Sequence, residues 1–191
     1  MTRFIGLYKE LKENENVILE DGILTPTVFV REVESKKFLG SKRRELPILC
    51  LMTTVYLTDK RLIFLVLHEI EAVALRKRGV PALTGVEGSW YEIPLSAIRS
   101  VTTVRKEIKR EKEFGKVLSN LTAREAVALT EISYDGGRAS GGLKEYIKSI
   151  FDVEGMEKIF DVKKIVSMTD KVHMLSEQAV SLVPKLKSLC L

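Results

Sequence analysis

Apolar positions are densest between residues 48 and 67, where two runs of β-favouring residues flank one short polar segment. The first run ends at residues 55–57, the second covers 62–67, and residues 58–61 between them are too few and too polar for anything except a tight turn. This pattern predicts a β-hairpin. Because apolar residues occupy both faces of the pleat, we expect strands that are covered on both sides or strongly curled.

A second patterned stretch, residues 90–101 (WYEIPLSAIRSV), begins and ends as a strand but changes in the middle. Pro94 fixes its own φ angle and ends the first strand. The next residues fit one helical turn, with Leu95 and Ile98 on the same side. A strand then resumes at 99–104.

The hairpin VYLTDKRLIF, followed after a variable insert by EIPLSAIRSV, resembles the core signature of GRAM domains and bacterial pleckstrin-homology-like domains. The match is close over roughly residues 46–105 and looser to about 150. The resemblance implies a strongly bent antiparallel sheet with a helix plugging one open end, and a usual role in docking lipid head groups or protein segments. Both motifs are core-packing patterns, so they indicate a fold more than a ligand.

Before the hairpin, apolar residues at helical spacing predict a leading helix over residues 1–13. Strands are expected at 17–19 and 23–33, and Pro26 places the second of them at a sheet edge or a bend. A loop over 34–45 follows.

Beyond the second stretch, the chain is expected to finish the sheet and then turn helical. Residues 126–134 fit a strand, the glycine-rich residues 136–142 a flexible link, and 143–151 the helix that plugs the sheet in the family. With the insert at 68–89, these elements define a barrel domain over 14–152. The expected fold class is α+β: a bent antiparallel β-barrel of about seven strands, plugged by a helix, with a C-terminal helical extension.

The extension, residues 154–191, carries apolar residues at alternating three- and four-residue spacing, which predicts a long helix that ends or kinks just before Pro184. This helix seam comprises Ile165, Met168, Val172, Leu175, Ala179, Leu182, Leu186 and Leu189. Burying the seam would contribute roughly 10 kcal/mol or more, at ~1.5 kcal/mol for each residue, so something should cover it. Either the tail folds back on its own barrel, or it pairs with a second protein, including another copy of itself.

The composition indicates a folded cytoplasmic protein, at most peripheral to the inner face of the membrane. Of 191 residues, 45% are hydrophobic and 30% charged, no apolar run approaches the ~20 residues that span a bilayer, and residues 1–17 lack the features of a secretory signal. Cys50 and Cys190 have no ligand-like spacing. Few amide side chains beside many charges of both signs are typical of thermophilic prokaryotes, archaea included.

The strongest candidate binding site is a basic loop that comprises Lys36, Lys37, Lys42, Arg43 and Arg44. In pleckstrin-homology domains that bind phosphoinositides, the loop joining the first strands holds the phosphates, and this loop has the corresponding place. The alternative is a merely solvated loop, since glutamates nearby dilute its charge. A second basic cluster, which helix capping also explains, comprises Arg76, Lys77 and Arg78.

No motif indicates catalysis. The link at 136–142 places glycines between a strand and a helix, as phosphate-binding loops do, but it lacks the Lys and Ser or Thr of a Walker loop and any GxGxxG. His68 and His173 belong to no catalytic or metal-binding motif, and His173 should be a packed or half-exposed side chain beside the helix seam. We therefore expect no enzyme, no cofactor and no metal.

We expect a non-catalytic binding or adaptor module that docks a protein partner or an anionic lipid surface and uses its helical tail for assembly, including homo-oligomers. One alternative is a nucleic-acid-binding protein, for which the pI of about 9.1 is favourable; however, aromatic residues are only 7% and are not interleaved with the basic runs. The other alternative is a small enzyme that binds a phosphorylated ligand at the link between Gly136 and Gly142.

Overall fold

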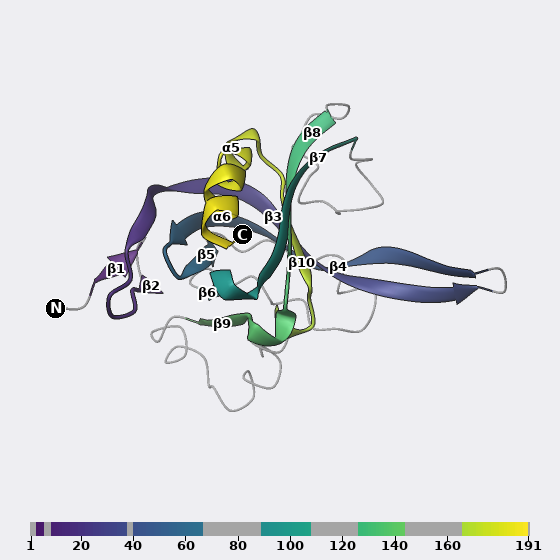
Figure 1. Cartoon of the computed structure of the whole chain (residues 1–191), viewed down its shortest axis with the longest axis horizontal. Coiled ribbons are helices and arrows are strands. Elements are labelled where there is room, and N and C mark those ends of the chain that lie inside the picture. The colour runs from purple at the N-terminus through teal and green to yellow at the C-terminus, as the bar shows by residue number, and fades with distance from the viewer. Residues whose placement is uncertain are drawn as a thin grey trace.

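The computed structural model describes residues 3–5, 9–37, 40–66, 89–107, 126–143 and 166–190. In this part of the chain antiparallel strands dominate, and short α-helices follow near the C-terminus (Figure 1), so the α+β class expected from the sequence is confirmed. The strands are β1 (Phe4–Ile5), β2 (Lys9–Glu10), β3 (Val17–Lys37), β4 (Gly40–Thr58), β5 (Arg61–Val66), β6 (Ser89–Pro94), β7 (Ile98–Glu107), β8 (Ala126–Tyr134), β9 (Ser140–Leu143) and β10 (Lys171–Met174). The helical segments are the 3₁₀ turns η1 (Leu95–Ala97) and η3 (Gly136–Arg138) and the helices α5 (Glu177–Val180) and α6 (Leu182–Cys190).

Eight of the described strands form one antiparallel sheet in the order β7-β8-β10-β3-β4-β5-β6-β9, and β1 pairs with β2 as a separate hairpin. The order places β10 between β8 and β3, although β10 follows both of them along the chain. The sheet is therefore completed by a strand that is distant in sequence from both of its neighbours.

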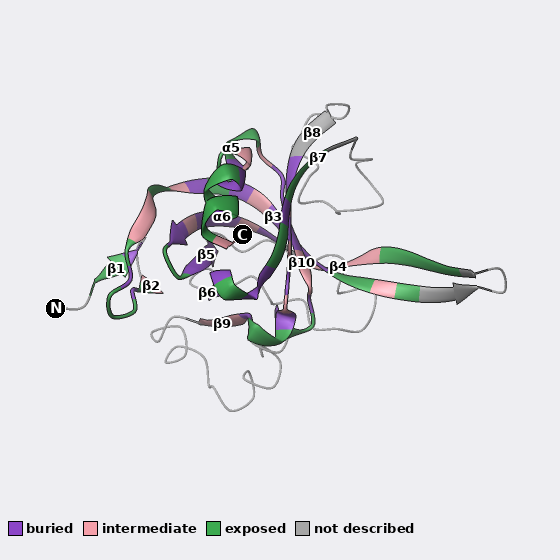
Figure 2. Cartoon of the chain, in the orientation of Figure 1, coloured by how far each residue is buried: buried purple, intermediate pink, exposed green. Residues whose placement is uncertain are grey.

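The predicted central hairpin is confirmed: β4 pairs with β5, with Tyr56 opposite Ile63 and Val55 opposite Phe64. Every residue of β5 is buried (Figure 2). Alternate residues point to opposite faces of a strand, so Phe64 enters the main core, where its ring meets that of Phe29 edge-on at a centroid distance of 5.3 Å. Ile63 packs in a second cluster. The expectation that these strands are covered on both sides is also confirmed.

The second cluster shows that the leading helix predicted over residues 1–13 is wrong. In the described part of this segment the chain forms the β1–β2 hairpin, and Ile5 and Leu11 pack against Ile63 and Leu65 of β5. An isolated helix of this length is marginal in water. The hairpin instead uses its apolar residues to cover a face of β5 that the main core does not reach.

The loop predicted over residues 34–45 is a further correction. Its described residues form the outer part of the β3–β4 hairpin, which projects from the rest of the sheet (Figure 1). The strands expected at 17–19 and 23–33 merge into β3 through register shifts. Because β3 lies between β10 and β4, Pro26 is not at a sheet edge; it lies just beyond the β10 ladder, where its carbonyl accepts a hydrogen bond from the Leu175 amide at 2.9 Å.

Two corners connect the strand pairs at the ends of the sheet. The predicted helical turn after Pro94 is confirmed as η1, which leads β6 into β7, and η3 leads β8 into β9. The corners touch: the Asp135 amide donates to the Ala97 carbonyl at 2.9 Å, and the Arg138 guanidinium donates to the carbonyl and the hydroxyl of Ser96, both at 2.7 Å. The predicted flexible link is thus an ordered turn and strand.

Replacing Gly136 with alanine should destabilise the fold by about 1–3 kcal/mol, the usual cost of overpacking. A Cβ at this position would lie 2.0 Å from the Thr169 carbonyl oxygen and 3.0 Å from that of Ser167. Gly137→Ala is the matched control, because the nearest atom to its Cβ is Asp135 Oδ1, at 3.3 Å. Urea unfolding compares the two variants, and equal free energies of unfolding would contradict this packing of η3.

The helix predicted over residues 154–191 is wrong between 171 and 174, where the chain forms β10. Val172 lies opposite Phe29 of β3 and Ile132 of β8, and all three side chains are buried in the main core. A residue assigned to the helix seam therefore belongs to the core face of a strand. The three- and four-residue spacing did not reveal this, because a four-residue strand is too short to establish a pattern of its own.

Beyond β10, the seam residues Ala179, Leu182 and Leu186 are buried in the main core, so the tail covers its own sheet. The predicted interruption just before Pro184 is present, because α5 ends at Val180 and α6 begins at Leu182. Pro184 itself lies in the first turn of α6, where a missing N–H costs little. Leu175 is also buried, Met168 and Leu189 are exposed, and Ile165 lies outside the described residues. Assembly through the exposed seam residues stays a prediction. Neither described α-helix is long and apolar enough to cross a bilayer.

Candidate functional site

The basic residues predicted as a binding loop lie on the projecting β3–β4 hairpin. The backbone places Lys36 and Lys37 in β3 and the other three in β4, where Lys42, Arg43 and Arg44 are exposed. The second basic cluster, at 76–78, lies outside the described residues. The structure therefore brings the first set together on a ribbon.

The pleat of this ribbon separates the charges. Cross-strand partners share a face, and the register pairs Arg31 with Leu46 and Val33 with Arg44. Lys42 lies two positions from Arg44 along β4, hence on the same face. We call Arg31, Lys42 and Arg44 the basic face; all three are exposed, and among the described side chains of the ribbon this face carries no carboxylate.

The opposite face of the ribbon, the mixed face, carries three carboxylates and one described cation. Glu32 lies opposite Glu45, and Glu34 lies opposite Arg43. Arg43 Nη1 is 3.5 Å from Glu32 Oε1. Arg43 was predicted to act with Lys42 and Arg44, but the pleat puts it on the other side, among acidic groups that reduce its field. Sequence reasoning could have found this separation only after pairing the two arms.

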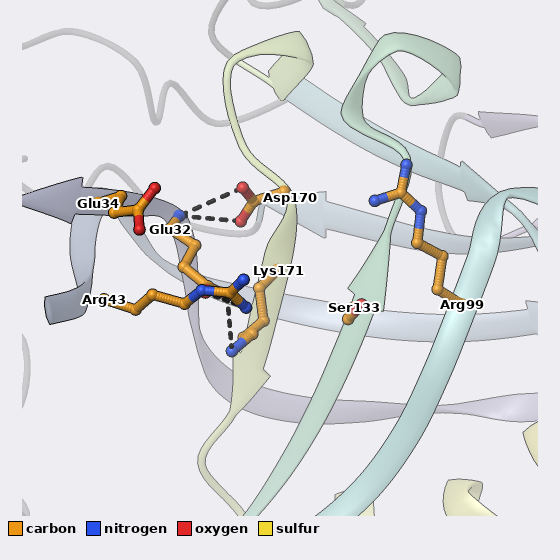
Figure 3. Close-up of a pocket in the computed structure, with 7 residues that line it drawn as sticks. All are labelled: Glu32, Glu34, Arg43, Arg99, Ser133, Asp170 and Lys171. Atoms are coloured by element: carbon orange, nitrogen blue, oxygen red, sulfur yellow. Dashed lines mark hydrogen bonds and ion pairs between the residues drawn. The ribbon is translucent and has the colours of Figure 1, made fainter. Parts of the chain in front are cut away.

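At the base of the hairpin, the mixed face borders a groove of about 270 Å³ (Figure 3). The groove is lined by Glu32, Glu34, Arg43, Arg99, Ser133, Asp170 and Lys171. Asp170 fixes its wall, because both carboxylate oxygens accept from the Glu32 amide, at 3.0 and 3.2 Å. With three cations beside three carboxylates, this groove has no strong preference for an anion. A neighbouring depression of about 390 Å³ shares Arg99 and Asp170 and adds Arg31.

A charged cluster joins four strands beside this groove. Lys171 Nζ is 2.6 Å from Glu45 Oε1, 3.4 Å from Glu131 Oε1 and 3.9 Å from Glu32 Oε2. Burial by itself would lower the pKa of Lys171, but the hydrogen bond and charge of Glu45, with those of Glu131, outweigh it and the pKa lies above its ordinary value of 10.5. The lysine ammonium therefore holds neighbouring strands together as a charged group.

His173 completes this cluster. It was predicted beside a helix seam, but it lies on β10 and only 2% of it is exposed. Its Nε2 atom is 3.5 Å from Glu45 Oε2 and 3.4 Å from Glu131 Oε2. The three residues bring one donor atom each to within 4.8 Å of one another. Sequence reasoning missed this group because its members come from β4, β8 and β10.

A second polar cluster centres on Arg61, which was predicted as part of a polar turn but is only 2% exposed. Its Nε and Nη2 donate to the two oxygens of the Glu15 carboxylate, both at 2.8 Å, and Nη1 pairs with Glu92. Lys9 lies 3.3 Å from Glu92 and stacks its ammonium over the Trp90 ring, 3.1 Å from the centroid. This cluster fixes the N-terminal segment to β5 and β6.

Burial and the neighbouring charged groups have opposite effects on the pKa values of this cluster. Burial alone would raise the pKa of Glu15, but hydrogen bonds from Arg61 and Thr58 outweigh it, so the pKa lies below its ordinary value of 4.5. Glu92 also has a lowered pKa, because the charges of Lys9 and Arg61 outweigh the effect of burial. Burial lowers the pKa of Lys9 despite the opposing charge of Glu92. We interpret the cluster as structural, since its charges satisfy one another.

The glycine link offers little to a phosphate. The Gly137 amide donates to Asp135 Oδ1 at 3.0 Å, the Arg138 amide to the Asp135 carbonyl at 3.1 Å, and the Ala139 amide to the Gly136 carbonyl at 3.1 Å. These donors are engaged within the chain, whereas a phosphate-binding loop directs its amides at the ligand.

Comparison of the chain with models of known protein families, with curated proteins and with solved structures finds no match.

Proposed function

We propose that the protein is a non-catalytic binding module that docks on an anionic membrane surface through the basic face of its projecting hairpin. The observation that carries this proposal is the sorting of charge by the pleat: Arg31, Lys42 and Arg44 share an exposed face of the ribbon, and no described side chain of the ribbon on that face is a carboxylate. A uniformly anionic surface complements such a face better than a protein surface of mixed charge. The net charge of +5 also favours attraction to an anionic surface.

We further propose that the sheet forms the bent barrel of a GRAM or pleckstrin-homology-like domain, as the sequence resemblance implies. Support comes from the two corners. β6 continues through η1 into β7, β8 continues through η3 into β9, and each half of one bent strand pairs with a half of the other. The helix α6 packs against β7 and η1, where a plugging helix would lie. The sequence predicted that helix at 143–151 instead; Leu143 belongs to β9, and 144–151 lie outside the described residues.

The expected membrane affinity is modest. Each basic side chain near an anionic surface contributes about 1 kcal/mol, so the basic face supplies roughly 3 kcal/mol. Binding should therefore need a membrane rich in acidic lipid and should weaken as salt screens the charges. Aromatic residues such as Phe29, Phe64 and Tyr91 are buried in the core rather than displayed beside these cations, which favours a lipid surface over single-stranded nucleic acid.

Reversing the charge of Arg44 should reduce membrane binding, whereas the same change at its neighbour Arg43 should have little effect. Arg44→Glu replaces a favourable contribution by an unfavourable one on the basic face and should lower partitioning roughly thirty-fold, about 2 kcal/mol. Arg43→Glu makes the same change in net charge on the mixed face and is the matched control. Flotation with vesicles of phosphatidylcholine alone, or with phosphatidylserine added, measures the partitioning.

Three results would contradict the proposal. If the full-length protein did not bind vesicles that contain phosphatidylserine, an anionic membrane would be excluded as its ligand. Equal losses in the two variants would show that net charge matters and the basic face does not. Salt-sensitive binding to an oligonucleotide without binding to vesicles would favour the nucleic-acid alternative.

A further inference from the structure

In the charged cluster beside the groove, Lys171 and His173 contact different oxygens of the same two carboxylates, an arrangement that ion pairing alone does not require. In each of the two carboxylates, one oxygen faces Lys171 and the other faces His173: Lys171 is close to the Oε1 atoms of Glu45 and Glu131, and His173 Nε2 is close to their Oε2 atoms. An imidazole nitrogen and two carboxylate oxygens thus converge on one point from three strands.

The spacing of these donors suits a small metal ion. Ligand atoms bonded to Zn²⁺ at about 2.1 Å in tetrahedral geometry lie roughly 3.4 Å from one another. The separations from His173 Nε2 to Glu45 Oε2 and Glu131 Oε2 are 3.5 and 3.4 Å. The imidazole would need little movement, because His173 lies on a central strand and only 2% of the residue is exposed.

We propose that His173, Glu45 and Glu131 bind one divalent transition-metal ion, with Zn²⁺ as the preferred ion. Lys171 stays paired with the Oε1 atoms of Glu45 and Glu131 and thereby orients both carboxylates, as groups behind metal ligands commonly do. The carboxylates are 30% and 25% exposed, so the ion enters from their side, and water completes a four-coordinate site.

The donor types set the choice of ion. One imidazole with two carboxylates suits zinc and manganese, and of these two ions the order of affinities for divalent ions favours zinc. Magnesium prefers octahedral oxygen ligands and keeps its water, so it should bind far more weakly. The site links β4, β8 and β10 at the base of the projecting hairpin, and a bound ion would raise the midpoint of thermal unfolding.

The test uses full-length protein stripped with a chelator and titrated with ZnCl₂ against a chromophoric competitor. One Zn²⁺ should bind per chain, MnCl₂ should bind more weakly, and MgCl₂ should not compete. Glu131→Gln and His173→Ala should each weaken zinc binding at least ten-fold. Glu32→Gln is the matched control, because Glu32 is 3.9 Å from the same lysine and is not among the three donors; it should stay within about two-fold.

His68→Ala controls for binding by the other histidine of the chain. Because His173→Ala opens a buried site, its circular dichroism is compared with that of the parent protein. If His173→Ala is unfolded, the test relies on Glu131→Gln, which changes a part-exposed side chain. Stoichiometric zinc binding that survives Glu131→Gln, or that is lost only with His68, would overturn the proposal. So would an affinity too weak to raise the unfolding midpoint at a tenfold excess of zinc.

Discussion

A chain that ends at Gly155 is expected to lose its cooperative unfolding transition. The deletion removes β10, so β3 and β8 lose the strand between them, and it removes the helices that cover the main core. It takes away these buried apolar side chains: Val166, Val172, Met174, Leu182 and Leu186. At about 1.5–3 kcal/mol each, their burial contributes roughly 8–15 kcal/mol, which is as large as the net stability of an ordinary domain, about 5–15 kcal/mol.

Circular dichroism during a urea titration measures this loss. A chain that ends at Lys187 is the control, since it keeps Leu186 and removes the exposed Leu189; its transition should stay cooperative. If the chain ending at Gly155 unfolded with the midpoint of the full-length protein, β10 could not be part of the sheet. The tail would then be the separable extension that the sequence predicted.

Arg61→Ala should lower the free energy of unfolding by about 3–5 kcal/mol, the usual effect of removing one partner of a buried ion pair. The substitution leaves the fully buried Glu15 carboxylate without the guanidinium that holds both of its oxygens, and it removes one of the cations that face Glu92. Lys60→Ala, at the exposed neighbouring position, should change stability by less than about 0.5 kcal/mol. Equal effects of the two substitutions would contradict the burial of Arg61.

The dependence of stability on pH checks the same cluster. The pKa values of Glu15 and Glu92 are lowered in the folded state. Their contribution is therefore complete above the ordinary value of 4.5 and is lost as pH falls below it through the folded-state values. The parent protein should lose stability over this acidic range, and Arg61→Ala should lose less, because Glu15 and Glu92 no longer have the guanidinium that helps to lower their pKa values. Parallel curves for the two proteins would show that other groups cause the acid sensitivity.

Local pattern was sufficient where neighbouring residues decide the structure. The hairpin around Asp59 could be predicted because two β-favouring runs flank a turn too short for anything else. The turn after Pro94 could be predicted because proline fixes its own φ angle and ends the strand. In both cases the information lies within about ten residues of the chain.

Long-range partners explain the errors. Val172 and Leu175 fit a helical spacing, and nothing near them shows that β3, some 140 residues earlier, leaves room for a strand. Arg61 looked like a turn residue because its partner Glu15 lies 46 positions away and reaches it only when the N-terminal segment folds over β5. The placement of Arg43 and Arg44 on opposite faces of the hairpin likewise follows from the pairing of its two arms, which cannot be predicted from composition.

The late position of β10 also affects synthesis of the protein. A nascent chain that has emerged from the ribosome only as far as β9 exposes unpaired backbone donors and acceptors along both β3 and β8, and open strand edges of this kind recruit other chains. At roughly 5–20 residues per second, that interval lasts for seconds. Chaperone binding to the growing polypeptide should therefore concentrate in this window and end when residues 171–174 close the gap.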